Sequence, residues 1–217
     1  MIHCFAPEII LIFFRAKLAT LKFTSAKYPD SNMDLLLSPH NDDECLFAAY
    51  TLIRKKPLVV IVTDSDMQLE RGVTSEQRRQ ESRRACECLG VAVAYLGLKD
   101  GFVEDDDLQQ RLKPFANLQW ETVYAPAIEG GHRDHDVVGK IASALFPRVC
   151  YYSTYYNPAI GPNGDYEIIP TPHEIEMKNR ALDFYESQIS LPDVRVHFDS
   201  VKGKPEYLND DPQSHLR

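Results

Sequence analysis

The segment from Leu35 to Glu44 limits most strongly what this chain can fold into. Its apolar start predicts a short buried strand, and Pro39 favours extended backbone just before it, so the strand ends there. Asn41 or Asp42 can cap a following helix, and the acidic residues after them suit its positive first turn. The segment therefore predicts one imidazole and several carboxylates at the carboxyl end of a strand, where open α/β sheets bind their ligands.

A second cluster of the same kind occurs about ninety residues later, at Gly130-Gly131-His132-Arg133-Asp134-His135-Asp136. It follows an apolar strand predicted over 122–125 and precedes an amphipathic helix predicted over 137–145. Taken alone, each cluster is also typical of an ordinary helix cap. Together, at one edge of a parallel sheet, they offer imidazoles and carboxylates, which are the ligands of a catalytic zinc with an open position.

The remaining pattern alternates strands and helices. Pro57 precedes an uninterrupted β-branched run typical of a central parallel strand, and Thr74 or Ser75 can cap a helix that Gly90 ends. This order predicts an α/β fold, a Rossmann-like doubly wound and mainly parallel sheet with helices on both faces. The predicted strands are 35–37, 58–62, 91–96, 122–125 and 149–153, and the predicted helices are 43–54, 75–89, 104–115 and 137–145.

The C-terminal part is expected to add a small substrate lobe. A loop rich in Gly, Pro and Asn over 157–164 precedes a short strand at 166–169 and a helix over 173–188. From Asp199 the chain is polar and is expected to be poorly ordered. We therefore expect an N-terminal extension over 1–32, a domain over 33–198 whose lobe covers 153–198, and a polar tail over 199–217.

Composition narrows the class of protein. The net charge of -8 over 217 residues, with no Lys/Arg stripe, argues against nucleic acid as a partner. The apolar run over 9–14 is too short to span a membrane. Five scattered cysteines without zinc-ribbon spacing suit reduced thiols in a cytoplasmic protein. Nothing in the sequence decides between a monomer and a homo-oligomer.

The two clusters resemble the paired signatures of a known family. Pro39-His40-Asn41-Asp42-Asp43-Glu44 is similar to the (A/P)HPDDE signature of the PIG-L (LmbE-like) zinc-dependent N-deacetylases, and His132-Arg133-Asp134-His135 is similar to their HPDH. Weaker similarities are Arg78-Arg79-Gln80-Glu81, the segment 96–101 and Ser187-Gln188. The resemblance runs from about Leu35 to Gln188 and implies the same α/β fold.

Carried over residue by residue, the resemblance implies one Zn²⁺ per chain, although other divalent metals suit the same ligands. The implied zinc ligands are His40, Asp43 and His135. Asp42 would be the general base that takes a proton from water, and His132 would stabilise the oxyanion or protonate the leaving amine. Asp134 would orient one of the histidines.

Arg78 and Asp100 match family positions that hold the sugar. Residue by residue, other interpretations stay open: Asp42 as a helix cap, Arg78 as a surface residue on a very polar helix, and Asp100 as half of a turn pair with Gly101.

Three positions depart from the family pattern. Asn41 and Arg133 stand where proline is usual, which changes the stiffness of each turn but not the ligands. Gly130 lies two before His132, where some members carry a mobile tyrosine, so a phenol would have to come from elsewhere, such as Tyr155 or Tyr156, or the site uses none.

The resemblance implies a hydrolase that removes an N-acetyl group from a small N-acetylated amino sugar or sugar conjugate. Two alternatives stay open: an amidase of the same fold that acts on a larger acyl or thiol-conjugate amide, and a carbohydrate-binding module without turnover.

Overall fold

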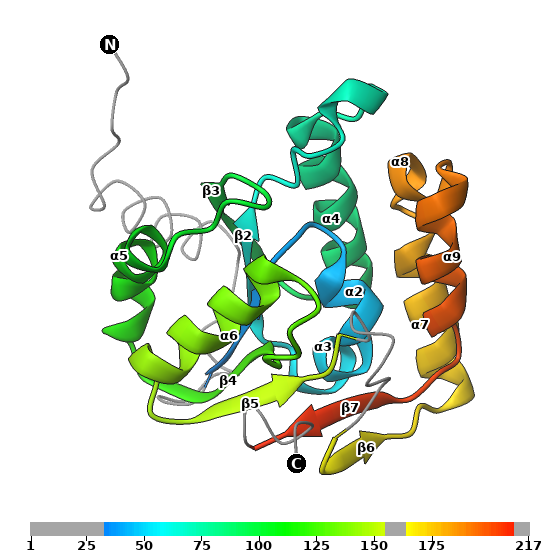
Figure 1. Cartoon of the computed structure of the whole chain (residues 1–217). Coiled ribbons are helices and arrows are strands. Elements are labelled where there is room, and N and C mark those ends of the chain that lie inside the picture. Colours follow the sequence, from blue (N-terminus) through cyan, green and yellow to red (C-terminus); the bar gives the residue numbers. More distant parts are fainter. Residues whose placement is uncertain (1–32, 155–163, 211–217) are drawn as a thin grey trace, which may run out of the picture.

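One mixed sheet of seven strands organises the chain, seen in a computed structural model that describes residues 33–154 and 164–210. The strand order is β3-β2-β1-β4-β5-β7-β6, with β7 and β6 antiparallel to their neighbours and the other pairs parallel (Figure 1). The mainly parallel α/β prediction is confirmed. The strands are β1 (Met33–Ser38), β2 (Leu58–Thr63), β3 (Val93–Leu98), β4 (Trp120–Pro126), β5 (Val149–Tyr152), β6 (Tyr166–Ile168) and β7 (Glu206–Asn209).

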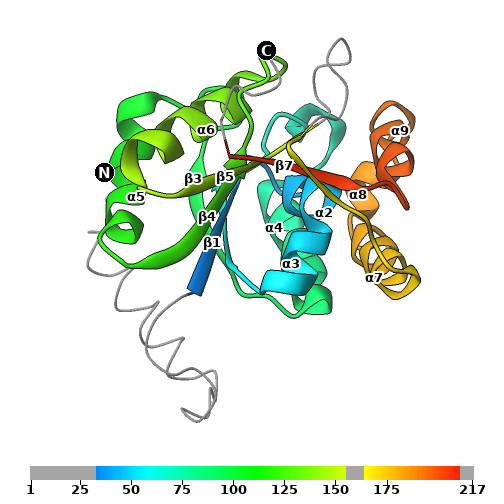
Figure 2. The ribbon, with the colours of Figure 1, turned by 90° about the horizontal axis from the view of Figure 1, so that it is seen from below.

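Helices cover both faces of this sheet, as Figures 1 and 2 show. Leu36 and Ile61 face the layer of α2, α3 and α4, whereas Leu35, Leu37 and Val60 face α5 and α6, because successive side chains of a strand point to opposite faces. The helices are α2 (Asp43–Phe47), α3 (Ala49–Lys55), α4 (Ser75–Leu89), α5 (Asp105–Ala116), α6 (Arg133–Leu145), α7 (Pro172–Leu182), α8 (Glu186–Ile189) and α9 (Pro192–Val201), with a 3₁₀ turn, η1 (Leu69–Arg71).

Two predicted helices are each divided in the structure. The helix expected over 43–54 breaks at Ala48 into α2 and α3, and the helix expected over 173–188 breaks after Leu182 into α7 and α8. The helix predicted from Val137 instead begins at Arg133, with His132 as its N-cap. The second cluster therefore lies on the first turn of α6.

The expectation of an irregular polar tail from Asp199 is wrong for the residues described. α9 continues to Val201, and β7 enters the sheet between β5 and β6. The polar composition hid this because the first residue of β7, Glu206, is a charged side chain that is only 1% exposed. Residues 1–32, 211–217, Tyr155 and Tyr156, and nearly all of the Gly/Pro loop lie outside the described residues.

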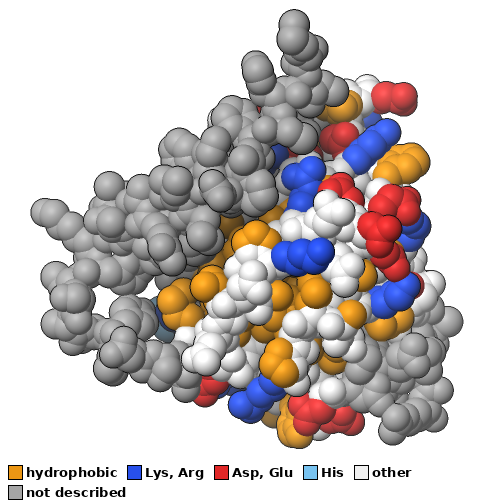
Figure 3. Space-filling view, turned by 90° about the vertical axis from the view of Figure 1, so that its left-hand side faces the viewer, with side chains coloured by type: hydrophobic (Ala, Val, Ile, Leu, Met, Phe, Trp, Pro, Cys, Tyr) orange, Lys and Arg blue, Asp and Glu red, His pale blue; other side chains and the backbone are white. Residues whose placement is uncertain are grey.

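The charged side chains, the helices and the cysteines of the described residues can be compared with the expectations from composition. On the face seen in Figure 3, Lys and Arg side chains stand beside Asp and Glu side chains, with hydrophobic side chains visible between them. No helix among the described residues is long and apolar enough to cross a membrane. Cys45, Cys86, Cys88 and Cys150, the cysteines within the described ranges, are free thiols.

Candidate metal centre and substrate cavity

The two predicted turns meet because of the strand order. β1 lies between β2 and β4 in the sheet. After β1 the chain adds β2 and β3 on one side of it, and then crosses over to add β4 and β5 on the other side. Such a reversal of direction opens a crevice at the carboxyl ends of the strands. His40 follows β1 and His135 follows β4, and the parallel pairing of these strands brings both imidazoles to that crevice.

Three donor atoms converge there. His40 Nδ1 lies 2.9 Å and His135 Nε2 lies 3.0 Å from Asp43 Oδ2, and the two nitrogens are 3.2 Å apart. Zinc bonds of about 2.0–2.1 Å in a tetrahedral arrangement separate their donor atoms by about 3.3 Å. Two imidazole nitrogens and one carboxylate oxygen at this spacing fit a divalent cation with a further position open.

The start of α2 explains how Asp43 is held. The backbone N–H of His40 donates to Asp43 Oδ2 at 3.0 Å, and Asp42 is the N-cap residue of the helix. Asp42, however, makes no cap hydrogen bond with its side chain, which accepts instead from Arg78 Nη2 at 2.8 Å. Asp42 therefore occupies the N-cap position, as one interpretation expected, but its side chain does not cap α2.

Glu44, the third carboxylate of the first cluster, points elsewhere. Its carboxyl group accepts from Tyr185 Oη at 2.5 Å and from Ser38 Oγ at 3.1 Å. Burial raises the pKa of Glu44 to about 8. Glu44 therefore links the turn after β1 to Tyr185 and does not join the three converging donor atoms.

His132 lies beside both of these histidines, with ring centroids 4.7 Å from His40 and 5.0 Å from His135. The backbone N–H of Asp134 donates to His132 Nδ1 at 3.2 Å. The neutral ring therefore carries its proton on Nε2. Burial, together with the neighbouring His40 and His135, lowers the pKa of His132, which favours this neutral form.

Asp134 and Asp100 lie on the far side of His40. His40 Nε2 is 3.2 Å from Asp100 Oδ1 and 3.4 Å from Asp134 Oδ2. Asp134 is fully buried and also accepts from the backbone of Gly101 at 2.6 Å and Val103 at 3.3 Å. Burial alone would raise the pKa of Asp134, but His40 and these backbone donors hold it below its ordinary value. Asp134 thus fixes the loop that carries Asp100.

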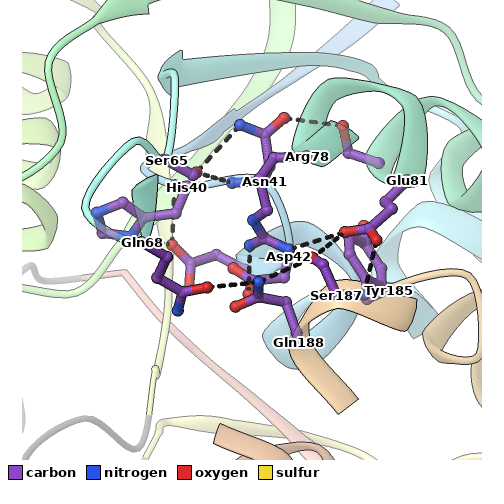
Figure 4. Close-up of polar contacts among 12 residues, drawn as sticks. His40, Asn41, Asp42, Ser65, Gln68, Arg78, Glu81, Tyr185, Ser187 and Gln188 are labelled. Carbon is purple, nitrogen blue, oxygen red and sulfur yellow. Dashed lines mark hydrogen bonds and ion pairs between the residues drawn. The ribbon is translucent and has the colours of Figure 1, made fainter. Parts of the chain in front are cut away.

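Arg78 is not a surface residue, although its helix is very polar. It is 3% exposed and pairs with Asp42 at 2.8 Å and with Glu81 at 3.3 Å (Figure 4). Glu81 in turn accepts from the backbone and hydroxyl of Ser187 at 2.8 and 2.7 Å. The sequence assigned no role to Glu81 or Ser187, yet the i, i+3 spacing of Arg78 and Glu81 already placed them on one helix face.

A cavity of about 390 Å³ opens over these groups. One side is polar and includes Arg78, Asp100 and His132, together with Gln68 and Gln188, whose side chains are joined by a 2.7 Å hydrogen bond. The other side comes from α2 and α9 and is mainly apolar, with His197 and Ser200 of α9 as its polar members. Its apolar residues are Leu46, Phe47, Val194, Phe198 and Val201, none of which the sequence singled out.

Solved structures share this fold at low sequence identity. The conserved protein TT1542 from Thermus thermophilus matches with a TM-score of 0.65 and 22% identity, over 83% of this chain and 94% of that one. The 4-carboxy-2-hydroxymuconate hydratase GalB from Pseudomonas putida matches at 0.62 and 15%, over 82% and 95%. The N,N'-diacetylchitobiose deacetylase from Pyrococcus horikoshii matches at 0.61 and 17%, over 100% and 97%.

Because these neighbours include both a hydratase and a deacetylase, the fold alone does not assign a reaction. Sequence comparison with curated proteins gave no match. The family model for PIG-L, described as GlcNAc-PI de-N-acetylase, matches residues 35–146, just over half of the 217-residue chain, and this range contains both clusters. The chain therefore belongs to the PIG-L family.

Proposed function

We propose that this protein is a metal-dependent N-deacetylase that hydrolyses the acetamide of an amino sugar or sugar conjugate. The observation that carries the proposal is the convergence of His40 Nδ1, Asp43 Oδ2 and His135 Nε2 within 3.2 Å of one another. Membership of the PIG-L family supports the reaction class, and the diacetylchitobiose deacetylase among the structural neighbours is consistent with it.

These three residues would hold one zinc ion. When bound, zinc supplies Lewis-acid chemistry: it polarises an amide carbonyl and makes water a better nucleophile at neutral pH. Asp100 and Asp134 would keep the His40 ring in place, because each presents a carboxylate oxygen to its second nitrogen.

Asp42 is the general base in this proposal. Its side chain lines the cavity next to Asp43, and Arg78 holds it by an ion pair of 2.8 Å. Burial raises the pKa of Asp42, which Arg78 only partly opposes. A carboxylate with a raised pKa is a stronger base than an ordinary carboxylate, and so it accepts a proton from the attacking water more readily. Asp42 would then return that proton to the departing amine nitrogen as the C–N bond breaks.

His132 would donate a hydrogen bond from Nε2 to the carbonyl oxygen as negative charge develops on it. The contact between its Nδ1 and the backbone of Asp134 fixes this tautomer. The lowered pKa of His132 favours a neutral donor over a charged acid. Of the two roles that the family resemblance implies for His132, these contacts support the oxyanion role in this proposal.

The polar residues that line the cavity support the proposal that the amine part of the substrate carries hydroxyl groups. Arg78, Gln68 and Gln188 offer guanidinium and amide groups suited to hydroxyl oxygens, which is why we infer a sugar or sugar conjugate. The apolar side formed by α2 and α9 favours a second candidate, an amidase that accepts an acyl group larger than acetyl. The cytoplasmic location remains a prediction, with the free cysteines as its support.

The test is release of free amine from a panel of N-acetylated sugars, measured with zinc content on the same samples. Asp42→Asn should lower kcat by about 10²–10⁴-fold and retain zinc, because it removes the base and keeps the shape of the side chain. Asp64→Asn is the matched control, since Asp64 pairs with Arg79 and does not line the cavity. Undiminished turnover by Asp42→Asn, or wild-type protein inert on every amide while loaded with zinc, would contradict the proposal.

A further inference from the structure

Helix α2, which carries Asp43, is only five residues long and ends inside the protein. The break at Ala48 leaves the last carbonyls of α2 and the first N–H groups of α3 without helical partners. Neither helix has a side-chain cap of its own at this break, and Leu46, Ala48 and Tyr50 are all buried. Unsatisfied backbone groups at such a place would destabilise the junction.

Two charged residues from the C-terminal part of the chain supply the missing partners. Glu206 of β7 accepts from the backbone N–H of Tyr50 at 3.0 Å and of Thr51 at 3.3 Å. Lys178 of α7 donates to the carbonyl of Leu46 at 2.7 Å. The negative group therefore lies at the positive N-terminus of α3, and the positive group lies at the negative C-terminus of α2.

Lys178 and Glu206 also pair with each other, at 3.1 Å, and each is 1% exposed. A buried pair of this kind contributes little to stability by itself, since burying both charges costs about as much as their attraction returns. Its specific effect is to fix geometry. β7 and α7 lie against the α2–α3 junction in Figures 1 and 2, so the pair anchors this junction to α7 and to the antiparallel part of the sheet.

The junction is close to the candidate metal centre. Leu46, which Lys178 holds, follows Asp43 by three residues, about 4.5 Å along a helix axis. A short helix held at its C-terminal end has little freedom at its N-terminal end, where Asp42 and Asp43 lie. We propose that the Lys178–Glu206 pair is a positioning pair, which sets the direction of α2 and thereby the place of Asp43 opposite His40 and His135.

This inference rests on the proposed function, because zinc is the ligand that reports the position of Asp43. The measured quantity is therefore the zinc dissociation constant, obtained by competition with a chelator, with amine release as a second readout. Lys178→Met and Glu206→Gln should each weaken zinc binding by about 10–100-fold, the effect typical of groups that orient metal ligands. The double variant should lose little more than the worse single variant, since the two residues act as one unit.

The matched control is Leu112→Ala. Leu112 is fully buried on α5, in the hydrophobic cluster on the opposite face of the sheet. This variant should lower Tm without a change in zinc affinity beyond about twofold, because Leu112 packs on the face of the sheet opposite to α2. Folded Lys178 and Glu206 variants that bind zinc as tightly as the wild type would overturn the inference alone. Wild-type protein that binds no zinc would overturn the proposed function and the inference with it.

If the Lys178 and Glu206 variants do not fold, a second measurement on wild-type protein tests the inference instead. Coupling is reciprocal, so zinc should in turn stabilise the junction in wild-type protein. Hydrogen exchange at the Tyr50 and Thr51 amides, which donate to Glu206, should slow by about tenfold on zinc loading, whereas amides of α5 should change little. Equal exchange at the junction with and without zinc would contradict the inference.

Discussion

Asn41 stands where the family signature has proline, and its side chain replaces the lost stiffness with hydrogen bonds. It is fully buried, and its Nδ2 donates to Ser65 Oγ at 3.0 Å (Figure 4). The same Nδ2 donates to Thr63 O at 3.2 Å, and Oδ1 accepts from Ser82 Oγ at 2.8 Å. One side chain thus ties the turn after β1 to the turn after β2 and to α4. The departure from the signature is compensated within this chain.

Asn41→Ala should reduce the free energy of unfolding by about 2 kcal/mol, because it leaves buried polar groups of Thr63, Ser65 and Ser82 without this partner. Urea unfolding with a chelator present measures this without a contribution from metal. Asn117→Ala, at an exposed helix end, should change stability by less than about 0.5 kcal/mol. Equal stability of the two variants would show that the Asn41 contacts are dispensable.

His132→Ala should lower kcat by about 10²–10³-fold with zinc content unchanged, because it removes the proposed donor to the oxyanion and no metal ligand. Parallel measurement of amine release and bound zinc separates the two effects. A variant that loses zinc together with activity would place His132 among the metal ligands instead; its ring lies close enough to His40 and His135 for that outcome to be informative.

The sequence predicted which residues meet at the site better than it predicted what each one touches. The ligand types follow from the two clusters, and a parallel sheet brings them to one edge. The burial of Arg78 could not be predicted, because it depends on Asp42, thirty-six residues away, and on α8. Local composition marked its helix as solvated, and only the tertiary partners reverse that expectation.

At the scale of elements, local signals were sufficient where an element satisfies its own backbone. Of the two N-caps that the sequence allowed, Thr74 and Ser75, the structure uses Thr74, which accepts from the backbone N–H of Gln77. The predicted stop at Gly90 is confirmed, since Gly90 adopts φ 72°. The break at Ala48 was missed because its partners, Lys178 and Glu206, are more than a hundred residues away. The same dependence on distant contacts hid β7.

The start of α7 makes a pH-dependent prediction. Glu174 closes a capping box with Thr171 and accepts from Arg54 Nε at 2.6 Å; Arg54 is the main cause that lowers the pKa of Glu174 to about 2. Because the folded state favours the charged form, this stabilisation is present above the unfolded pKa of about 4.5 and is lost as pH falls towards 2.

Glu174→Gln should therefore reduce the free energy of unfolding by about 1 kcal/mol at pH 7, a value discounted because Arg54 is 40% exposed. The difference from wild type should shrink steadily below pH 4.5, as followed by urea unfolding across pH. Glu176→Gln, at an exposed position two residues later, should show no such trend. A difference that is independent of pH would rule out the ion pair as its source.

At the scale of the whole molecule, the cavity is made by parts of the chain that the sequence analysis treated separately. The match to the family model ends at residue 146, whereas α8 and α9 supply Gln188 and much of the apolar side. The doubly wound half of the fold was predictable from its alternating pattern. The substrate side was not, because its apolar residues become a surface only when α9 packs beside α2.

Val194→Trp should narrow the apolar side and so change the choice of acyl group. We expect kcat/KM for a hexanoyl amide to fall by about tenfold and that for the acetyl amide to change much less, if the longer chain lies against α9. Val196→Trp on the same helix is the control, because Val196 is 60% exposed and does not line the cavity. An unchanged ratio between the two substrates would argue against the larger-acyl candidate.

The most direct measurement is the zinc content per chain of His40→Ala and His135→Ala, with His173→Ala, an exposed histidine on α7, as control. If the turns after β1 and β4 hold one ion jointly, the wild type and His173→Ala bind one zinc per chain, and each of the other two variants loses it. Stoichiometric zinc retained by either His40→Ala or His135→Ala would contradict the account.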